Sequence, residues 1–319
     1  MSSWIEAVPE AALVEARAFN EKLEKLLATL PSTHTLDPKV VRAARRAGKG
    51  IFPPPVFSPA AKDLEIATRP GAAHHTIKVR IVRPPGEPKG VYLHLHGGGW
   101  TLGAHDMQDT QLNETANATG LVVASVDYRL GPEHPFPAGI EDCEDAARWL
   151  VAEGAKALDT PARFAIGGES AGAHLAVTTL LRMPRRTFLA ANLVYGAYDM
   201  GQTPSQRNWG ERNLVLSGPI IAFFADCVLP GVSTEARRAP EISPLYADLA
   251  GMPPALFTVG TLDPLLDDTL FMEARWRAAG SSTALRVWPE AVHGFNSFPI
   301  ELGRLANLEQ YEFLASRLA

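Results

Sequence analysis

A serine between small residues is the strongest chemical signal in this chain. Residues 168–172 read Gly-Glu-Ser-Ala-Gly, after an apolar run at 164–167 and at the start of a helical pattern over 171–181. A G-x-S-x-G motif in that context is typical of a nucleophile elbow, a sharp turn from strand to helix that exposes the serine hydroxyl. The turn has no room for bulky neighbours, which explains the flanking small residues. The sequence therefore predicts that Ser170 is a nucleophile.

A glycine-rich segment upstream supplies the second signal. Residues 96–100 read His-Gly-Gly-Gly-Trp and directly follow an apolar strand pattern at 91–95. Consecutive glycines leave their backbone N–H groups unobstructed, and loops of this form supply oxyanion-binding amides in lipases and esterases. Each such donor contributes roughly 10²–10³ in turnover. Together the two motifs predict acyl-transfer chemistry.

A catalytic serine needs a base and a carboxylate, because its hydroxyl is a weak nucleophile at neutral pH. In the α/β-hydrolase order, the carboxylate and then the histidine follow the serine along the chain. Asp263 follows an apolar strand pattern at 255–260, and His293 follows the next one at 284–288. Both positions are carboxyl ends of strands, where open α/β sheets form their sites. We predict that Asp263 and His293 complete a triad with Ser170.

Other acidic and histidine residues are weaker candidates. Asp267 and Asp268 compete with Asp263, but they fall in the first turn of an expected helix, where acidic side chains complement the helix dipole. His174 lies on the helix after the elbow and is expected to pack there. No H-E-x-x-H or comparable ligand set occurs, so we expect neither a metal nor another cofactor. Structural roles are expected for the histidines nearer the N-terminus, His74, His75, His94 and His105.

An alternation of strands and helices must position these groups. Near-continuous apolar strand patterns separated by helical patterns are typical of a parallel sheet that is covered on both faces. Strands are expected at 76–82, 91–95, 121–126, 163–167, 192–195, 255–260 and 284–288. Helices are expected at about 105–119, 139–153, 171–182, 266–279 and 301–318. The sequence thus predicts an α/β fold.

Two segments stand outside this alternation. Apolar residues at three- and four-residue spacing predict an amphipathic helix over about 10–30, followed by a basic turn at 42–49 and three prolines at 53–55. A segment with several large apolar side chains interrupts the alternation at 200–240. We therefore expect a helical cap in two parts, 1–52 and 200–240, on a hydrolase core in two parts, 53–199 and 241–319.

Composition excludes several classes of partner. The chain has 319 residues and a formal net charge of −5 without a basic stripe, which argues against binding to nucleic acid. Its two cysteines lack C-x-x-C spacing, which argues against a disulfide scaffold or a thiolate metal site. Neither a leader pattern nor an apolar run of about 18 residues is present. We expect a cytoplasmic protein without stable membrane insertion that acts on small apolar substrates.

In combination, the motifs resemble the hormone-sensitive-lipase family of α/β-hydrolase carboxylesterases, and its bacterial branch in particular. The similarity extends from about residue 75 to the C-terminus, with matching motifs at 96–100, 127–138, 168–172, 263–265 and 293–295. The resemblance implies an α/β-hydrolase fold with a mostly parallel sheet and a helical cap. It implies these roles: nucleophile Ser170, acid Asp263, base His293, and oxyanion donors from the backbone of Gly98, Gly99 and Ala171, with Gly97 as a further candidate.

The resemblance also implies an activity. Members of the family hydrolyse short- to medium-chain acyl esters in an apolar pocket, and they often form homodimers. The chain departs from the common pattern at Glu169 and Ala173, where Asp and Gly are usual, and at Gly131, where Ala is usual. Two alternatives stay open: an arylformamidase-like amide hydrolase on the same scaffold, and a small-molecule receptor without catalysis, similar to the plant gibberellin receptors.

Overall fold

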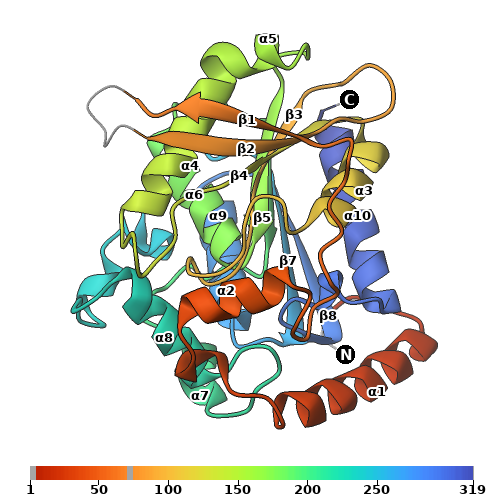
Figure 1. Ribbon diagram of the computed structural model, residues 1–319, viewed down its shortest axis with the longest axis vertical. Coiled ribbons are helices and arrows are strands. Elements are labelled where there is room, and N and C mark those ends of the chain that lie inside the picture. The colour runs from red at the N-terminus through yellow and green to blue at the C-terminus, as the bar shows by residue number, and fades with distance from the viewer. Residues whose placement is uncertain (1–4, 70–74, 319) are drawn as a thin grey trace.

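A central eight-stranded sheet organises the computed structural model, which describes residues 5–69 and 75–318 (Figure 1). The strands are β1 Lys62–Ala67, β2 Thr76–Val82, β3 Val91–Leu95, β4 Val122–Val126, β5 Phe164–Glu169, β6 Ala190–Val194, β7 Ala255–Leu262 and β8 Thr283–Val292. Their order in the sheet is β1-β2-β4-β3-β5-β6-β7-β8. β2 is antiparallel to β1 and β4, and all neighbours from β4 to β8 are parallel.

The predicted α/β fold with a mostly parallel sheet is therefore confirmed. The central strands β3, β4, β5 and β6 are buried along their whole length, which explains their continuous apolar sequences. The sequence analysis missed β1, which pairs only with β2 at the edge of the sheet. Its residues alternate between exposed and more buried positions, so polar and apolar residues are mixed in its sequence, unlike the continuous apolar sequences of the central strands. His74 lies outside the described residues.

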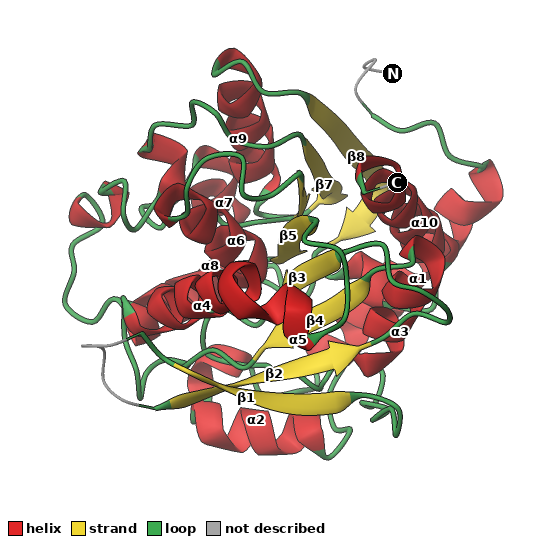
Figure 2. Ribbon diagram, turned by 90° about the horizontal axis from the view of Figure 1, so that it is seen from above, coloured by secondary structure: helices red, strands yellow, loops and turns green. Residues whose placement is uncertain are grey.

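Helices cover both faces of the sheet (Figure 2). The helices are α1 Glu10–Leu27, α2 Pro38–Arg46, α3 Asp109–Thr119, α4 Ala138–Trp149, α5 Ala155–Ala157, α6 Ala171–Arg182, α7 Pro204–Trp209, α8 Gly218–Val228, α9 Leu266–Ala278 and α10 Glu301–Arg317. α3 and α10 lie together on one face, whereas α4, α6 and α9 lie on the other. Among the described residues, no helix combines the length and the apolar character that crossing a membrane requires.

The N-terminal region differs from its prediction. The expected long helix ends at Leu27, and most of the expected basic turn is the separate helix α2. A carboxylate oxygen of Asp37 accepts a hydrogen bond from the Lys39 backbone N–H at 2.7 Å, and Pro38 occupies the first turn of α2. An Asp cap followed by Pro is a common helix start, so the signal for α2 was present in the sequence.

The two segments outside the alternation meet above the carboxyl ends of the parallel strands. In Figure 1, α1, α2, α7 and α8 gather at one end of the sheet. α1 packs against α10 and β8. α2 and α8 share an apolar cluster with loops of the sheet, which contains Val41, Leu102, Leu216, Ile220 and Phe224. Both segments are therefore positioned beside the loops that carry the sequence motifs.

Candidate active site

The turn between β5 and α6 holds Ser170 in a strained backbone conformation. Its φ is 56° and its ψ is −118°, a combination that side chains other than glycine rarely adopt. The Ser170 N–H donates to the Val194 carbonyl at 2.8 Å, which ties the turn to β6. A Cβ on Gly172 would collide with the Leu95 carbonyl oxygen, so glycine is required there. The predicted elbow geometry is present, and it leaves Ser170 partly exposed.

Ser170, His293 and Asp263 form a continuous hydrogen-bonded chain. The Ser170 Oγ lies 3.0 Å from His293 Nε2, and His293 Nδ1 lies 2.9 Å from Asp263 Oδ2. The other Asp263 oxygen accepts a hydrogen bond from the Leu265 N–H at 2.8 Å. His293 and Asp263 are buried, so the carboxylate and the imidazole have little exposure to water. The three residues predicted from the motif order therefore lie within reach of one another.

The alternative carboxylates lie elsewhere and have other partners. Asp267 accepts a hydrogen bond from the Ser205 N–H at 2.8 Å. Asp268 is buried and accepts hydrogen bonds from the Tyr198 N–H at 2.7 Å and from Thr203 and Gln206, both at 2.6 Å. Burial raises the pKa of Asp268 to about 6. These carboxylates hold the segment after β6 against α9 rather than facing His293.

The glycine loop lies beside the serine with two of its residues in positive-φ conformations. Gly98 has a φ of 124° and Gly99 a φ of 60°. The Gly98 carbonyl accepts from the N–H groups of Thr101 and Leu102, at 3.1 and 2.8 Å. Within residues 5–69 and 75–318, the backbone N–H groups of Gly98 and Gly99 donate to no acceptor of the protein. Both amides therefore remain available to a ligand.

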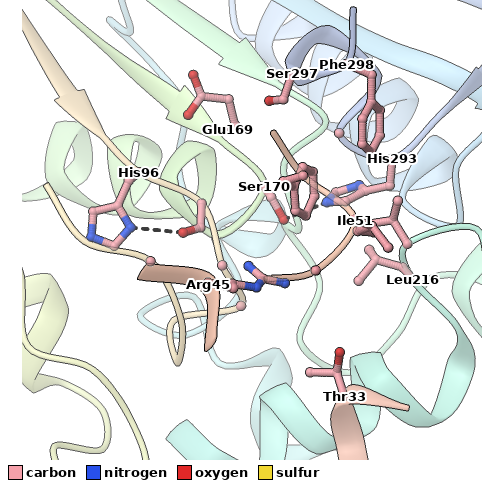
Figure 3. A pocket seen from close by; sticks show the side chains of 18 of the residues that line it. Thr33, Arg45, Ile51, His96, Glu169, Ser170, Leu216, His293, Ser297 and Phe298 are labelled. Carbon is pink, nitrogen blue, oxygen red and sulfur yellow. Dashed lines mark hydrogen bonds between the residues drawn. The ribbon is translucent and has the colours of Figure 1, made fainter. Parts of the chain in front are cut away.

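Ser170 and the glycine loop line a cavity of about 1100 Å³. Its wall comes from the sheet's carboxyl end, from α2 and α8, and from the chain between α1 and β1. Figure 3 shows Ser170 and His293 side by side at this cavity, with Ile51, Leu216 and Phe298 close to them. Much of the wall is apolar, including Leu27, Leu36, Val41, Ile51, Phe52, Leu216, Ile220, Phe224 and Phe298.

Comparison with known proteins identifies the family. Residues 92–297 match a family model described as the alpha/beta hydrolase fold. The chain is 34% identical to carboxylesterase NlhH of Mycobacterium tuberculosis over 286 residues, covering 87% of this chain and 89% of that protein. It is 33% identical to an ethyl acetate hydrolase of Pseudomonas putida, covering 73% of this chain and 74% of that protein. The chain belongs to this hydrolase family.

Solved structures agree with this assignment. A hyperthermophilic esterase from Pyrobaculum calidifontis matches 95% of this chain and 98% of its own, with a TM-score of 0.82 and 27% identity. The resemblance to the hormone-sensitive-lipase family of carboxylesterases is thereby confirmed. Family membership and the names of its relatives make this hydrolase a carboxylesterase.

His96 holds the glycine loop of the hydrolase through a side-chain hydrogen bond. Its ring is buried and stacks on Tyr128, with ring centroids 4.3 Å apart. Burial lowers the pKa of His96 to about 4, so the ring is neutral at neutral pH. Its Nδ1 lies 2.9 Å from the Gly97 carbonyl oxygen, the contact dashed in Figure 3, and donates to it. The bond fixes the turn from which the amides of Gly98 and Gly99 project.

Glu169 has a role that the sequence analysis did not assign. Its carboxylate accepts a hydrogen bond from His94 Nε2 at 3.0 Å, and His94 Nδ1 lies 3.1 Å from the Ser125 hydroxyl. Glu169 and His94 are both buried. This pair joins β3, β4 and β5 directly under the elbow. Only the sheet order could have indicated this pairing. In the chain, β4 comes between β3 and β5, whereas in the sheet β3 and β5 are direct neighbours.

Tyr195 lies against His293, a role that the sequence analysis did not predict. It expected Tyr195 only as part of the strand at 192–195. Its ring lies 4.6 Å from the His293 ring, measured between centroids. Its hydroxyl donates to the side-chain oxygen of Asn296, just beyond His293 in the chain. Tyr195 has a φ of 37°, an uncommon value outside glycine. The contact and the hydrogen bond limit the orientations open to the imidazole.

Proposed function

We propose that this carboxylesterase cleaves short- to medium-chain esters by forming an acyl ester on Ser170. The observation that carries the proposal is the hydrogen-bonded chain from Ser170 through His293 to Asp263 at a largely apolar cavity. A relative named as an ethyl acetate hydrolase supports the short end of this range. The apolar part of the wall favours alkyl chains, because burying them away from water is favourable.

In the first half-reaction, the Ser170 Oγ attacks the ester carbonyl carbon while its proton moves to His293 Nε2. The carbonyl oxygen becomes an oxyanion and accepts hydrogen bonds from the amides of Gly98, Gly99 and Ala171. His293 then gives its proton to the leaving oxygen as the C–O bond breaks. The alcohol departs, and the acyl group remains on Ser170.

In the second half-reaction, water takes the place of the alcohol. His293 Nε2 accepts a proton from the water as the water oxygen attacks the acyl carbon, and then returns that proton to Ser170 as the acid is released. Asp263 keeps a proton on Nδ1 and stabilises the imidazolium that forms in each half-reaction. Its burial strengthens this interaction, because the surroundings screen charge less than water does.

Residues 1–52 and 200–240 act as a cap in this proposal. α2 and α8 both supply cavity wall, and Phe224 of α8 lies against Gly99. The cap keeps water from the oxyanion and limits the length of the acyl chain that fits. Residues 53–199 and 241–319 supply the catalytic groups.

Initial rates on p-nitrophenyl esters from C2 to C16 test the proposal, with wild type and Ser170→Ala in parallel. We expect serine-dependent hydrolysis with a maximum between C2 and C8. Ester hydrolysis that persists in Ser170→Ala would contradict the assignment of the nucleophile. A wild type that is inactive on every ester yet hydrolyses N-formylkynurenine would favour the amide-hydrolase alternative.

A further inference from the structure

α2 carries three arginines, and two of them are paired with the core. Arg42 lies 2.6 Å from Glu133 and donates to the Thr101 carbonyl at 2.9 Å. Arg46, one turn further along the helix, lies 2.8 Å from Asp106. These bonds fix α2 over the loop that follows β3. The third arginine is held in place by the helix without an acidic partner of its own.

That third residue, Arg45, points into the cavity of Ser170 (Figure 3). Within the part of the chain that the structure describes, its guanidinium has neither a hydrogen bond nor an ion pair, and its one ring contact is with Phe52, 5.3 Å from the ring centroid. Burial lowers the pKa of Arg45 to about 10, so the group is still charged at neutral pH. Arg45 is half-buried, and a cation that is partly withdrawn from water without an anion beside it is unfavourable.

The carboxylates of the cavity wall do not neutralise this charge. Each of them accepts a hydrogen bond from another group: these residues are Glu15, Glu114, Glu169, Asp199 and Glu301. Among the described residues, none of these carboxylates forms a hydrogen bond or an ion pair with Arg45. Arg45 is therefore an unpaired positive charge on the wall of the cavity that contains the nucleophile.

We propose that Arg45 binds an anionic group of the substrate, so that the preferred substrates are esters that also carry a carboxylate remote from the scissile bond. This inference rests on the proposed function, since it concerns the substrate of the same site. Guanidinium pairs with carboxylate through two parallel hydrogen bonds. A single arginine balances a carboxylate with one charge better than a phosphate monoester, which carries about −1.5 to −2. The apolar wall accommodates the carbon chain between the two groups.

The carboxylate can belong to the acyl part or to the alcohol part, and matched substrates distinguish them. For the acyl side, monoethyl adipate is compared with ethyl heptanoate. For the alcohol side, 4-carboxyphenyl butyrate is compared with its neutral methyl ester. In each pair, kcat/KM for the anionic ester is divided by kcat/KM for the neutral ester, so a general loss of activity cancels from the ratio.

The variants are Arg45→Gln, Arg45→Lys and the control Arg207→Gln. We expect Arg45→Gln to lower the ratio roughly 10- to 100-fold in one of the pairs, mainly through KM, because a charged hydrogen bond is lost. Arg45→Lys restores part of the ratio by restoring the charge. Arg207→Gln removes the same charge from an exposed position of α7, outside the cavity wall, and keeps the wild-type ratio.

A second measurement separates this inference from the proposed function. Titration calorimetry of monoethyl adipate and of 4-carboxyphenyl butyrate into Ser170→Ala reports binding without turnover. Weaker binding of either ester after adding Arg45→Gln supports the inference even if the catalytic assignment fails. Equal ratios in wild type and Arg45→Gln for both pairs, together with equal binding of both esters, would overturn it, while serine-dependent hydrolysis of the neutral esters would leave the proposed function standing.

Discussion

The indole N–H of Trp100 donates to His174 Nδ1 at 3.0 Å, which joins the glycine loop to the helix that follows Ser170. His174 Nε2 in turn donates to the Ile242 carbonyl at 2.8 Å. Each ring nitrogen therefore has one defined role, and the ring must be neutral. Burial lowers the pKa of His174 to about 4, in agreement with that state. The glycine loop and the elbow are thus connected by a side-chain bond between residues far apart in sequence.

Replacing Trp100 with Phe tests this connection. The variant keeps an aromatic ring but leaves the buried His174 Nδ1 without a donor, so we expect a loss of about 1–3 kcal/mol in the free energy of unfolding. We also expect a lower kcat, because the loop that carries Gly98 and Gly99 is less firmly held. Urea unfolding and steady-state rates measure the two effects. Trp288→Phe is the matched control, because the buried Trp288 indole N–H has no partner among the described residues.

The strain at Ser170 predicts a difference in stability between two variants that lack its hydroxyl. Both Ser170→Ala and Ser170→Gly remove the hydroxyl, but only glycine adopts a φ of 56° without strain. We expect Ser170→Gly to be more stable than Ser170→Ala by about 1 kcal/mol, after allowing for the greater freedom of glycine in the unfolded chain. Thermal and urea unfolding measure this difference. Equal stability of the two variants would argue against strain at the elbow.

Sequence alone predicted the parts of the site that local patterns determine. The elbow, the glycine loop, Asp263 and His293 each follow an apolar strand, and the ends of parallel strands meet at one edge of a sheet. Arg45 and the pairing of His94 with Glu169 depend instead on how separate elements pack. The orientation of Arg45 follows from the bonds of Arg42 and Arg46 to the core. No local pattern contains that information.

Stability should depend on pH through the buried histidines. The pKa of His174 falls from 6.5 to about 4 on folding, so the unfolded chain takes up a proton between these values while the folded chain does not. Stability is fully present above about pH 6.5 and decreases as pH falls towards about 4, by about 1.4 kcal/mol per pH unit for each such group. His96 contributes in the same direction.

The variant His174→Gln isolates one of these contributions. Asp268 acts in the opposite direction, because its pKa is raised to about 6 and the folded chain gains a proton first. The decisive quantity is therefore the difference between wild type and variant, measured by urea unfolding from pH 7 to pH 4.5. We expect the slope against pH to change by about 1.4 kcal/mol per unit. Parallel curves would contradict a neutral, buried His174.

The variant Glu169→Asp restores the residue that is usual in the family and should nevertheless destabilise this chain. Asp is shorter by one carbon–carbon bond, about 1.5 Å, which withdraws the carboxylate from His94. A buried donor that loses its acceptor costs about 1–3 kcal/mol. Urea unfolding measures the loss, and Glu153→Asp at an exposed position is the control. Unchanged stability would mean that another group replaces the carboxylate.

The contact between Gly99 and Phe224 predicts a variant and its partial rescue. In Gly99→Ala, the new Cβ collides with the Phe224 ring, and alanine is strained at a φ of 60°. We expect kcat on p-nitrophenyl butyrate to fall at least roughly 100-fold, because the displaced loop withdraws a proposed oxyanion donor. Adding Phe224→Ala removes the collision but not the strain, so part of the activity returns. If the double variant is no more active than Gly99→Ala, the helix α8 does not limit the position of the loop.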